Sequence, residues 1–191
     1  MNPLTQRNCE IEYFDIDTDA SHIELGECIL KHISTQDFYT KTPIILCIGT
    51  DRATGDCLGP LVGEQLQQLG IKYKIFGNLS SPVHALNIRD VINHIQKAYD
   101  NPYVIAIDAS LGSSTHVGNI TVSDCPIFPG KGVNKKLPAI GDLSITGIVN
   151  ISGQNPSVLQ STRLYTVMQL ANCITDALIY SINHLEDFCP L

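Results

Sequence analysis

Several features of common protein classes are missing from this sequence of 191 residues. It has no tryptophan, only 6% aromatic residues and only 16% charged residues. No apolar run approaches the roughly 20 residues that a membrane-spanning helix needs, and the N-terminus lacks the charged-then-apolar pattern of a signal peptide. We therefore expect a protein that stays in the cytoplasm and does not contact a membrane.

Basic residues are also scarce relative to acidic ones. The sequence has 12 Lys and Arg against 19 Asp and Glu, a formal net charge of −7. Such a balance opposes attraction to phosphate backbones, so nucleic acid is not an expected partner. A hydrophobic content of 43% suits a globular chain. We predict a single domain over 1–191, with an N-terminal extension and short helix in 1–40 and an α/β core in 43–191.

The cysteines form no metal-binding or disulfide pattern. They number seven, an odd count, and no CxxC pair occurs among them. Neither a disulfide framework nor a zinc knuckle is therefore expected, and we predict no cofactor and no bound metal. Cysteines in apolar strands and helices behave as small hydrophobic residues.

Familiar catalytic and nucleotide-binding motifs are absent as well. The sequence contains no GxxxxGK[ST] and no GxGxxG after a strand. Ser110 lacks the GxSxG elbow of a serine hydrolase. Cys57 lies at the head of a predicted helix, where the helix dipole would lower a thiol pKa, but no histidine is near it in sequence to activate it.

The most informative stretch runs from Ile44 to Leu69. An apolar run from Ile44 to Ile48 predicts a buried strand, and a polar turn rich in Gly and Asp follows it. Pro60 and the apolar spacing up to Leu69 then predict a helix. In open α/β sheets, such loops lie at the carboxyl edge of the strands, where ligands bind.

Further elements alternate along the chain. A Ser cap and Glu24 predict a short helix over 21–34, in which His22 and His32 are interpreted as surface residues. The remaining predicted strands are 71–76, 103–108, 116–124 and 143–151, and the remaining helices are 88–99 and 157–185. This order predicts a mostly parallel α/β sheet with right-handed crossovers and helices on both faces.

Two aspartates are expected to converge in this sheet. In the flavodoxin-like strand order, the first and third strands are neighbours, which places Asp56 close to Asp108 at the switch point. Neighbouring carboxyl groups share a proton, so one can activate water while the other protonates a leaving group. From the pattern alone, catalysis, ligand or metal binding, and a structural cap remain open.

Residues around the pair are the predicted substrate contacts. They are Gly49, Asp51 and Gly55 in the loop after the first strand, and Lys131 in a basic loop. Backbone N–H groups of the 49–55 loop or Lys131 would stabilise a developing oxyanion. A solvated loop is the alternative interpretation for the lysine.

Three ordered motifs carry a family resemblance: GTDRATGDCLGP, VIAIDASLG and IFPGKGVNKK. Together they resemble the YyaC-type sporulation proteins of endospore-forming bacteria, relatives of the germination protease and, through the fold, of the hydrogenase-maturation endopeptidases. The resemblance runs from about Pro43 to the C-terminus. It implies a three-layer α/β/α, phosphorylase/hydrolase-like fold, and the two aspartates proposed as catalytic in the germination protease fall on Asp56 and Asp108.

The sequence also differs from these related families. Of the nickel ligands of the hydrogenase-maturation enzymes, Asp108 matches the Asp, but Cys57 stands at the Glu position and no His follows at suitable spacing. The chain is shorter than the germination protease, so self-cleaving activation is not expected to carry over. The resemblance implies a sporulation-associated endopeptidase acting on a peptide or protein substrate. The alternative is a non-catalytic binding or regulatory protein with the same crevice. The oligomeric state stays open, a homo-oligomer included.

Overall fold

The computed structural model describes residues 9–18, 20–129, 139–153 and 159–185. The described strands form one sheet of six, in the order β1-β5-β6-β4-β2-β3. The strands are β1 (Ile11–Asp15), β2 (Thr42–Cys47), β3 (Lys74–Phe76), β4 (Pro102–Gly112), β5 (Asn119–Ser123) and β6 (Leu143–Ile151). The helices are α1 (Ser21–Ile33), α2 (Gln36–Tyr39), α3 (Leu58–Gln68), α4 (Ile88–Ala98) and α5 (Leu164–His184).

Three parallel pairs make up the central part of the sheet. β2 pairs in parallel with both β3 and β4, and β4 pairs in parallel with β6. β5 and β1 continue the sheet as antiparallel strands. The predicted mostly parallel α/β sheet is therefore confirmed. The first and third strands of the predicted core, β2 and β4, are neighbours in it, as predicted.

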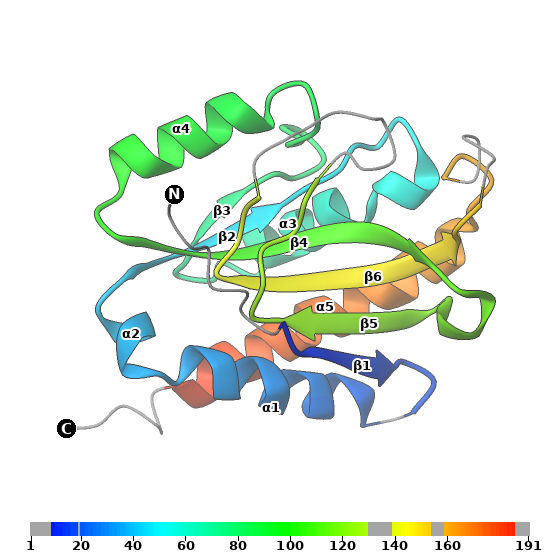
Figure 1. Ribbon diagram of the computed structural model, residues 1–191, viewed down its shortest axis with the longest axis horizontal. Helices are drawn as coiled ribbons and strands as arrows, with labels where there is room; N and C mark the ends of the chain where they lie inside the picture. The colour runs from blue at the N-terminus through cyan, green and yellow to red at the C-terminus, as the bar shows by residue number, and fades with distance from the viewer. Residues whose placement is uncertain (1–8, 19, 130–138, 154–158, 186–191) are drawn as a thin grey trace, which may run out of the picture.

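Helices cover the sheet on two sides (Figure 1). α1, α3 and α5 pack on one face, where Leu25, Leu58 and Ile174 belong to a single apolar cluster. α4 packs on the other face, where Ile88 and Ile95 meet side chains of β2 and β4. Right-handed crossovers explain this split, because the chain leaves β2 toward β3 in one direction and returns past β2 to β4 in the other. The predicted three-layer α/β/α architecture is confirmed.

Alternating burial in β4 explains its continuous apolar sequence. Ile105 and Ile107 point into the cluster under α1, α3 and α5, whereas Val104 points toward α4. A strand that is covered on both faces needs apolar residues at odd and even positions.

Several boundaries differ from the sequence prediction. Ser21 does not cap α1: Ala20 is the N-cap, and the Ser21 hydroxyl donates to the Ile16 carbonyl from within the first turn. β3 begins at Lys74 rather than residue 71, and His116 lies in a 3₁₀ turn before β5. α5 begins at Leu164, after the predicted start at residue 157.

The residues before β2 are part of the same core. Leu25 and Ile29 of α1 are fully buried in the cluster that also contains Leu178 of α5. Gly26 lies so close to Tyr180 that an added Cβ would approach the ring within 2.6 Å. None of the described helices combines the length and the apolar content that crossing a bilayer requires.

The structure corrects the prediction for two of the cysteines. Ile11 of β1 lies opposite Ser123 of β5, and extending this register by two residues places Cys9 opposite Cys125, with which it forms a disulfide. Cysteines 28, 47, 57 and 173 are buried free thiols. The pairing follows from strand register between segments 116 residues apart, which cysteine spacing does not reveal.

Reduction of this disulfide should lower the free energy of unfolding by about 2–4 kcal/mol, because the bridge restricts the unfolded chain over a long loop. Urea unfolding of the wild type with and without dithiothreitol measures the difference. Cys9→Ser should unfold at the lower midpoint under both conditions. Equal wild-type midpoints with and without reductant would contradict the expectation.

Candidate active site

The loop after β2 is held in shape by the backbone. Gly49 has φ +142°, and its N–H donates to the Val83 carbonyl at 2.7 Å. A Cβ on Gly49 would collide with the carbonyl oxygen of Asp56. The Thr50 N–H donates to that same carbonyl at 2.9 Å, which closes the loop and fixes the position of Asp56. The glycine predicted from sequence is thus required by a left-handed conformation and by close approach.

The far end of the loop is fixed to the segment that leads into α5. Asp56 ends a 3₁₀ turn, Thr54–Asp56. The Gly55 N–H donates to the Leu159 carbonyl at 2.8 Å, and a Cβ on Gly55 would lie 2.8 Å from the Thr162 hydroxyl. Asp56 is therefore half-buried at a position set by both its neighbouring strand and a distant segment.

Asp108 lies within β4 rather than at its end. The pairing of β2 with β4 stops at Cys47 and Ile107, whereas β4 continues beside β6 to Gly112. Asp108 is thus the first residue of β4 beyond the end of β2, and its Oδ1 accepts the N–H of Ala109 at 2.9 Å. The sequence prediction ended this strand at Asp108 because the apolar run stops there.

The two carboxyl groups have raised pKa values. Burial raises the pKa of Asp56 from 3.8 to about 6, although the backbone N–H of Thr50 acts in the opposite direction. Burial raises the pKa of Asp108 well above its usual range, and the negative charge of Asp56 raises it further. The two side chains are therefore near enough to interact electrostatically, as the predicted strand order requires.

The two pKa shifts determine which carboxyl group loses its proton first. Asp56 loses its proton first, near pH 6, and its charge then helps Asp108 to keep a proton at higher pH. A pair with one anionic and one protonated carboxyl can accept a proton at one oxygen and donate one at another.

Cys57 does not have the properties of a nucleophile. Its side chain is buried, and burial raises the pKa of its thiol, as do the charges of Asp51 and Asp56. Among the described residues, Asp56 and Asp108 belong to no group of three side chains placed to hold a metal.

A row of hydroxyl groups continues from Asp108 across the sheet. Thr146 of β6 pairs with Asp108, and Thr121 of β5 pairs with Thr146. The two threonine hydroxyls are 2.7 Å apart, and the Ser110 hydroxyl is 3.3 Å from that of Thr146. Sequence reasoning missed this row, although polar residues at alternate positions in several strands would have indicated a polar sheet face.

The predicted substrate contacts have different surroundings. Asp51 is exposed in the loop, close enough to raise the pKa of the Cys57 thiol. The N–H groups of Gly49 and Gly55 have partners within the chain, so a substrate would have to contact other atoms of these residues. Lys131 lies outside the described residues. The substrate-binding roles of these four residues remain predictions.

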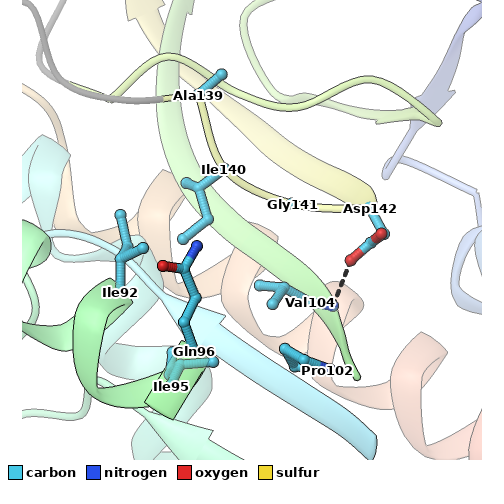
Figure 2. Close-up of a pocket in the computed structure, with 9 residues that line it drawn as sticks. All are labelled: Ile92, Ile95, Gln96, Pro102, Val104, Ala139, Ile140, Gly141 and Asp142. Carbon is cyan, nitrogen blue, oxygen red and sulfur yellow. Dashed lines mark hydrogen bonds between the residues drawn. The ribbon is translucent and has the colours of Figure 1, made fainter. Parts of the chain in front are cut away.

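Two cavities lie near the amino ends of β4 and β6. One, of about 210 Å³, is enclosed by α4, the start of β4 and residues 139–142, and Figure 2 shows Asp142 accepting the Val104 N–H there. The second, of about 280 Å³, shares Gly141 and Asp142 and is also lined by His32 and Lys41. Neither cavity is lined by Asp56 or Asp108, so neither cavity belongs to the site of the aspartate pair.

Asp56→Asn should lower the pKa of Asp108, because it removes the negative charge that raises it. Asp108→Asn should leave the pKa of Asp56 near 6, since burial is the main cause there. Carboxyl ¹³C NMR titrations measure both values, with Asp51→Asn as a control. An unchanged Asp108 pKa in Asp56→Asn would show that the carboxyl groups do not interact.

The raised pKa of Asp56 also makes the stability of the protein depend on pH. Since the fold raises the pKa of Asp56 from 3.8 to about 6, the stability that this group contributes is fully present below pH 3.8 and is lost as the pH rises through 6.

Gly49→Ala should destabilise the protein by about 1–3 kcal/mol, because the substituted residue would combine a strained φ with a backbone collision. Urea unfolding gives the difference. Gly153→Ala is the matched control, since a Cβ at Gly153 meets open space. Equal effects of the two substitutions would contradict the structural role of Gly49.

Comparison with known proteins gives a family match and similarities to individual proteins. Residues 13–177 match the family described as "Protein of unknown function (DUF1256)". The chain is 48% identical over 163 residues to "Uncharacterized protein YyaC" of Bacillus subtilis (strain 168), which covers 84% of this chain and 79% of that protein. Among solved structures, it is similar to the [NiFe] hydrogenase maturation protease HycI from Thermococcus kodakarensis KOD1, with a TM-score of 0.49 and 16% identity, over 80% of this chain and 99% of that one.

The family match spans most of the chain, from within β1 to within α5. The YyaC protein carries a sequence similarity of the same extent. Both agree with the resemblance that the three motifs carry. The chain belongs to the DUF1256 family.

Proposed function

We propose that this protein is an endopeptidase of sporulating cells in which Asp56 and Asp108 carry out the hydrolysis. The observation that supports this most is the electrostatic interaction of two half-buried carboxyl groups at the switch point between β2 and β4. Strongly perturbed carboxyl groups brought together from two segments are typical of acid–base sites. The resemblance to the germination protease supplies the peptide chemistry and the link to sporulation, and we place the protein in the cytoplasm.

The order of protonation assigns the roles. Asp56, anionic above about pH 6, takes a proton from the attacking water. Asp108, which keeps its proton longer, donates it to the leaving amide nitrogen. Peptide hydrolysis needs both transfers, because the amine is a poor leaving group without a proton.

The surroundings of the pair suit an extended polar substrate. The hydroxyl row of Ser110, Thr146 and Thr121 lies beside Asp108 and offers hydrogen-bond donors and acceptors to a peptide backbone. Gly49, Asp51 and Gly55 of the 49–55 loop, together with Lys131, are proposed to contact the substrate as well.

Asp56→Asn and Asp108→Asn should each lower the cleavage rate by at least about 100-fold, because each removes one half of the acid–base pair. The rate should rise as Asp56 loses its proton near pH 6 and fall where Asp108 loses its own. The assay is incubation with proteins extracted from developing spores, followed by mass spectrometry of new peptide termini. Asp90→Asn, which removes an exposed carboxylate from the first turn of α4 and keeps both members of the pair, is the control for a general effect of removing a carboxylate.

Cleavage by Asp108→Asn at the wild-type rate would disprove the paired mechanism. Absence of new termini with the wild-type protein would instead favour the alternative, a non-catalytic sporulation protein that uses the crevice to bind a peptide. In that case the folded Asn variants should still bind the same partner in a co-purification.

A further inference from the structure

Three side chains with metal-binding atoms meet between β1 and α1, away from the aspartate pair. They are Glu12, Cys28 and His32, and their ligand atoms all lie within 4.8 Å of one another. The Cys28 Sγ is 3.4 Å from the Glu12 Oε1, and the His32 Nε2 is 3.9 Å from the same oxygen. This is the only such group among the residues that the structure describes.

Local structure explains why the three converge. In β1, exposed and half-buried residues alternate, and Glu12 is one of the half-buried residues that face α1. Cys28 and His32 are four residues apart in α1, so they occupy the same face of the helix one turn apart. The sequence prediction treated His32 as a surface residue and Cys28 as an ordinary thiol, because nothing along the chain indicates that Glu12 lies opposite them.

The separations match a tetrahedral metal site. Zinc binds sulfur at about 2.3 Å and nitrogen or oxygen at about 2.0–2.2 Å, so two ligand atoms of a tetrahedral site lie roughly 3.3–3.7 Å apart. The sulfur–oxygen distance is already within this range, and the nitrogen–oxygen distance needs to close by only a few tenths of an ångström. The third pair, the Cys28 sulfur and the His32 nitrogen, lies within 4.8 Å.

The donor set selects the metal. A thiolate, an imidazole and a carboxylate suit zinc, whereas magnesium and calcium prefer oxygen ligands alone. The side chains of His32 and Glu12 are 24% and 41% exposed, so a hydrated ion can reach them from solvent and water is available as a fourth ligand. We propose that Glu12, Cys28 and His32 bind one Zn²⁺ ion.

Such an ion would fasten the edge of the sheet. β1 is an edge strand that pairs only with β5. A zinc ion would tie it directly to α1, whose other side packs on α5. β5 and β6 separate β1 from β4, so the site is distinct from the proposed catalytic pair and does not depend on peptidase activity.

Zinc binding also replaces an existing hydrogen bond. Without metal, the Cys28 thiol donates a hydrogen bond to the Glu12 carboxylate. On binding, the sulfur coordinates the ion as a thiolate and the proton goes to solvent, so one proton is released for each ion bound. Zinc affinity should consequently fall as the pH is lowered.

The test uses the full chain, stripped of metal with a chelator and with the Cys9–Cys125 disulfide intact. Isothermal titration with ZnCl₂ should give one ion per chain. Titration with Co²⁺ should give the thiolate-to-cobalt charge-transfer absorption, which requires a cysteine ligand. Zn²⁺ should also raise the melting temperature of the wild type.

Cys28→Ser, His32→Asn and Glu12→Gln should each weaken Zn²⁺ binding by at least about tenfold, the lower limit reported even for residues that only support metal ligands. Cys28→Ser should abolish the cobalt absorption. The controls His22→Asn and Glu24→Gln, on the first turns of the same helix, should bind as the wild type does, and circular dichroism checks that each variant is folded. No binding by the wild type, or binding that folded Cys28→Ser retains in full, would overturn the proposal.

Discussion

The parallel pairing of β2 with β4 positions every other part of the candidate site. Both strands are covered on both faces, and their apolar residues supply the centre of the two clusters that hold the helices. Because the two strands have different lengths, Asp108 lies just beyond the end of β2, on the side where the loop carrying Asp56 leaves that strand. A strand pair with a buried apolar centre thus presents two polar side chains at its carboxyl end, as expected at the switch point of an α/β sheet.

Burial and charge determine how Asp56 and Asp108 bind protons. Removing a carboxylate from water is unfavourable, which raises the pKa of Asp56 and of Asp108, and the negative charge of Asp56 raises the pKa of Asp108 further. The surrounding structure keeps the two groups in place: Gly49 allows the loop to turn back on Asp56, and Gly55 packs against the segment before α5. An arrangement that is costly for the fold and rigidly held is characteristic of functional sites.

The antiparallel edge of the sheet is organised in a different way. β1 has one neighbouring strand, and the disulfide from Cys9 to Cys125 joins the two at their ends. Disulfides are uncommon in reducing compartments, and reduction of this one would leave β1 attached to β5 by the strand pairing. The proposed zinc site at Glu12, Cys28 and His32 would attach the same strand to α1 by a link that is separate from the disulfide.

The sequence by itself determined the fold class, most of the strands and helices of the core, and the two aspartates. Those elements have strong local signals, such as the continuous apolar run of β4 and the periodic apolar stripe of α4, and handedness rules then limit how they can be assembled. The strand order that placed Asp56 near Asp108 followed from those rules. The position of Ser21 inside α1 was not predicted, because a capping pattern does not show whether the serine is buried against other segments.

Only the tertiary structure decided the remaining features. The continuation of β4 past Asp108, the hydroxyl row through Thr146, and the pairing of Cys9 with Cys125 all depend on which residue of one strand lies opposite which residue of another. The meeting of Glu12 with His32 likewise depends on how β1 packs against α1. Register and packing arise from contacts between segments far apart in the chain, and local propensity carries no information about them.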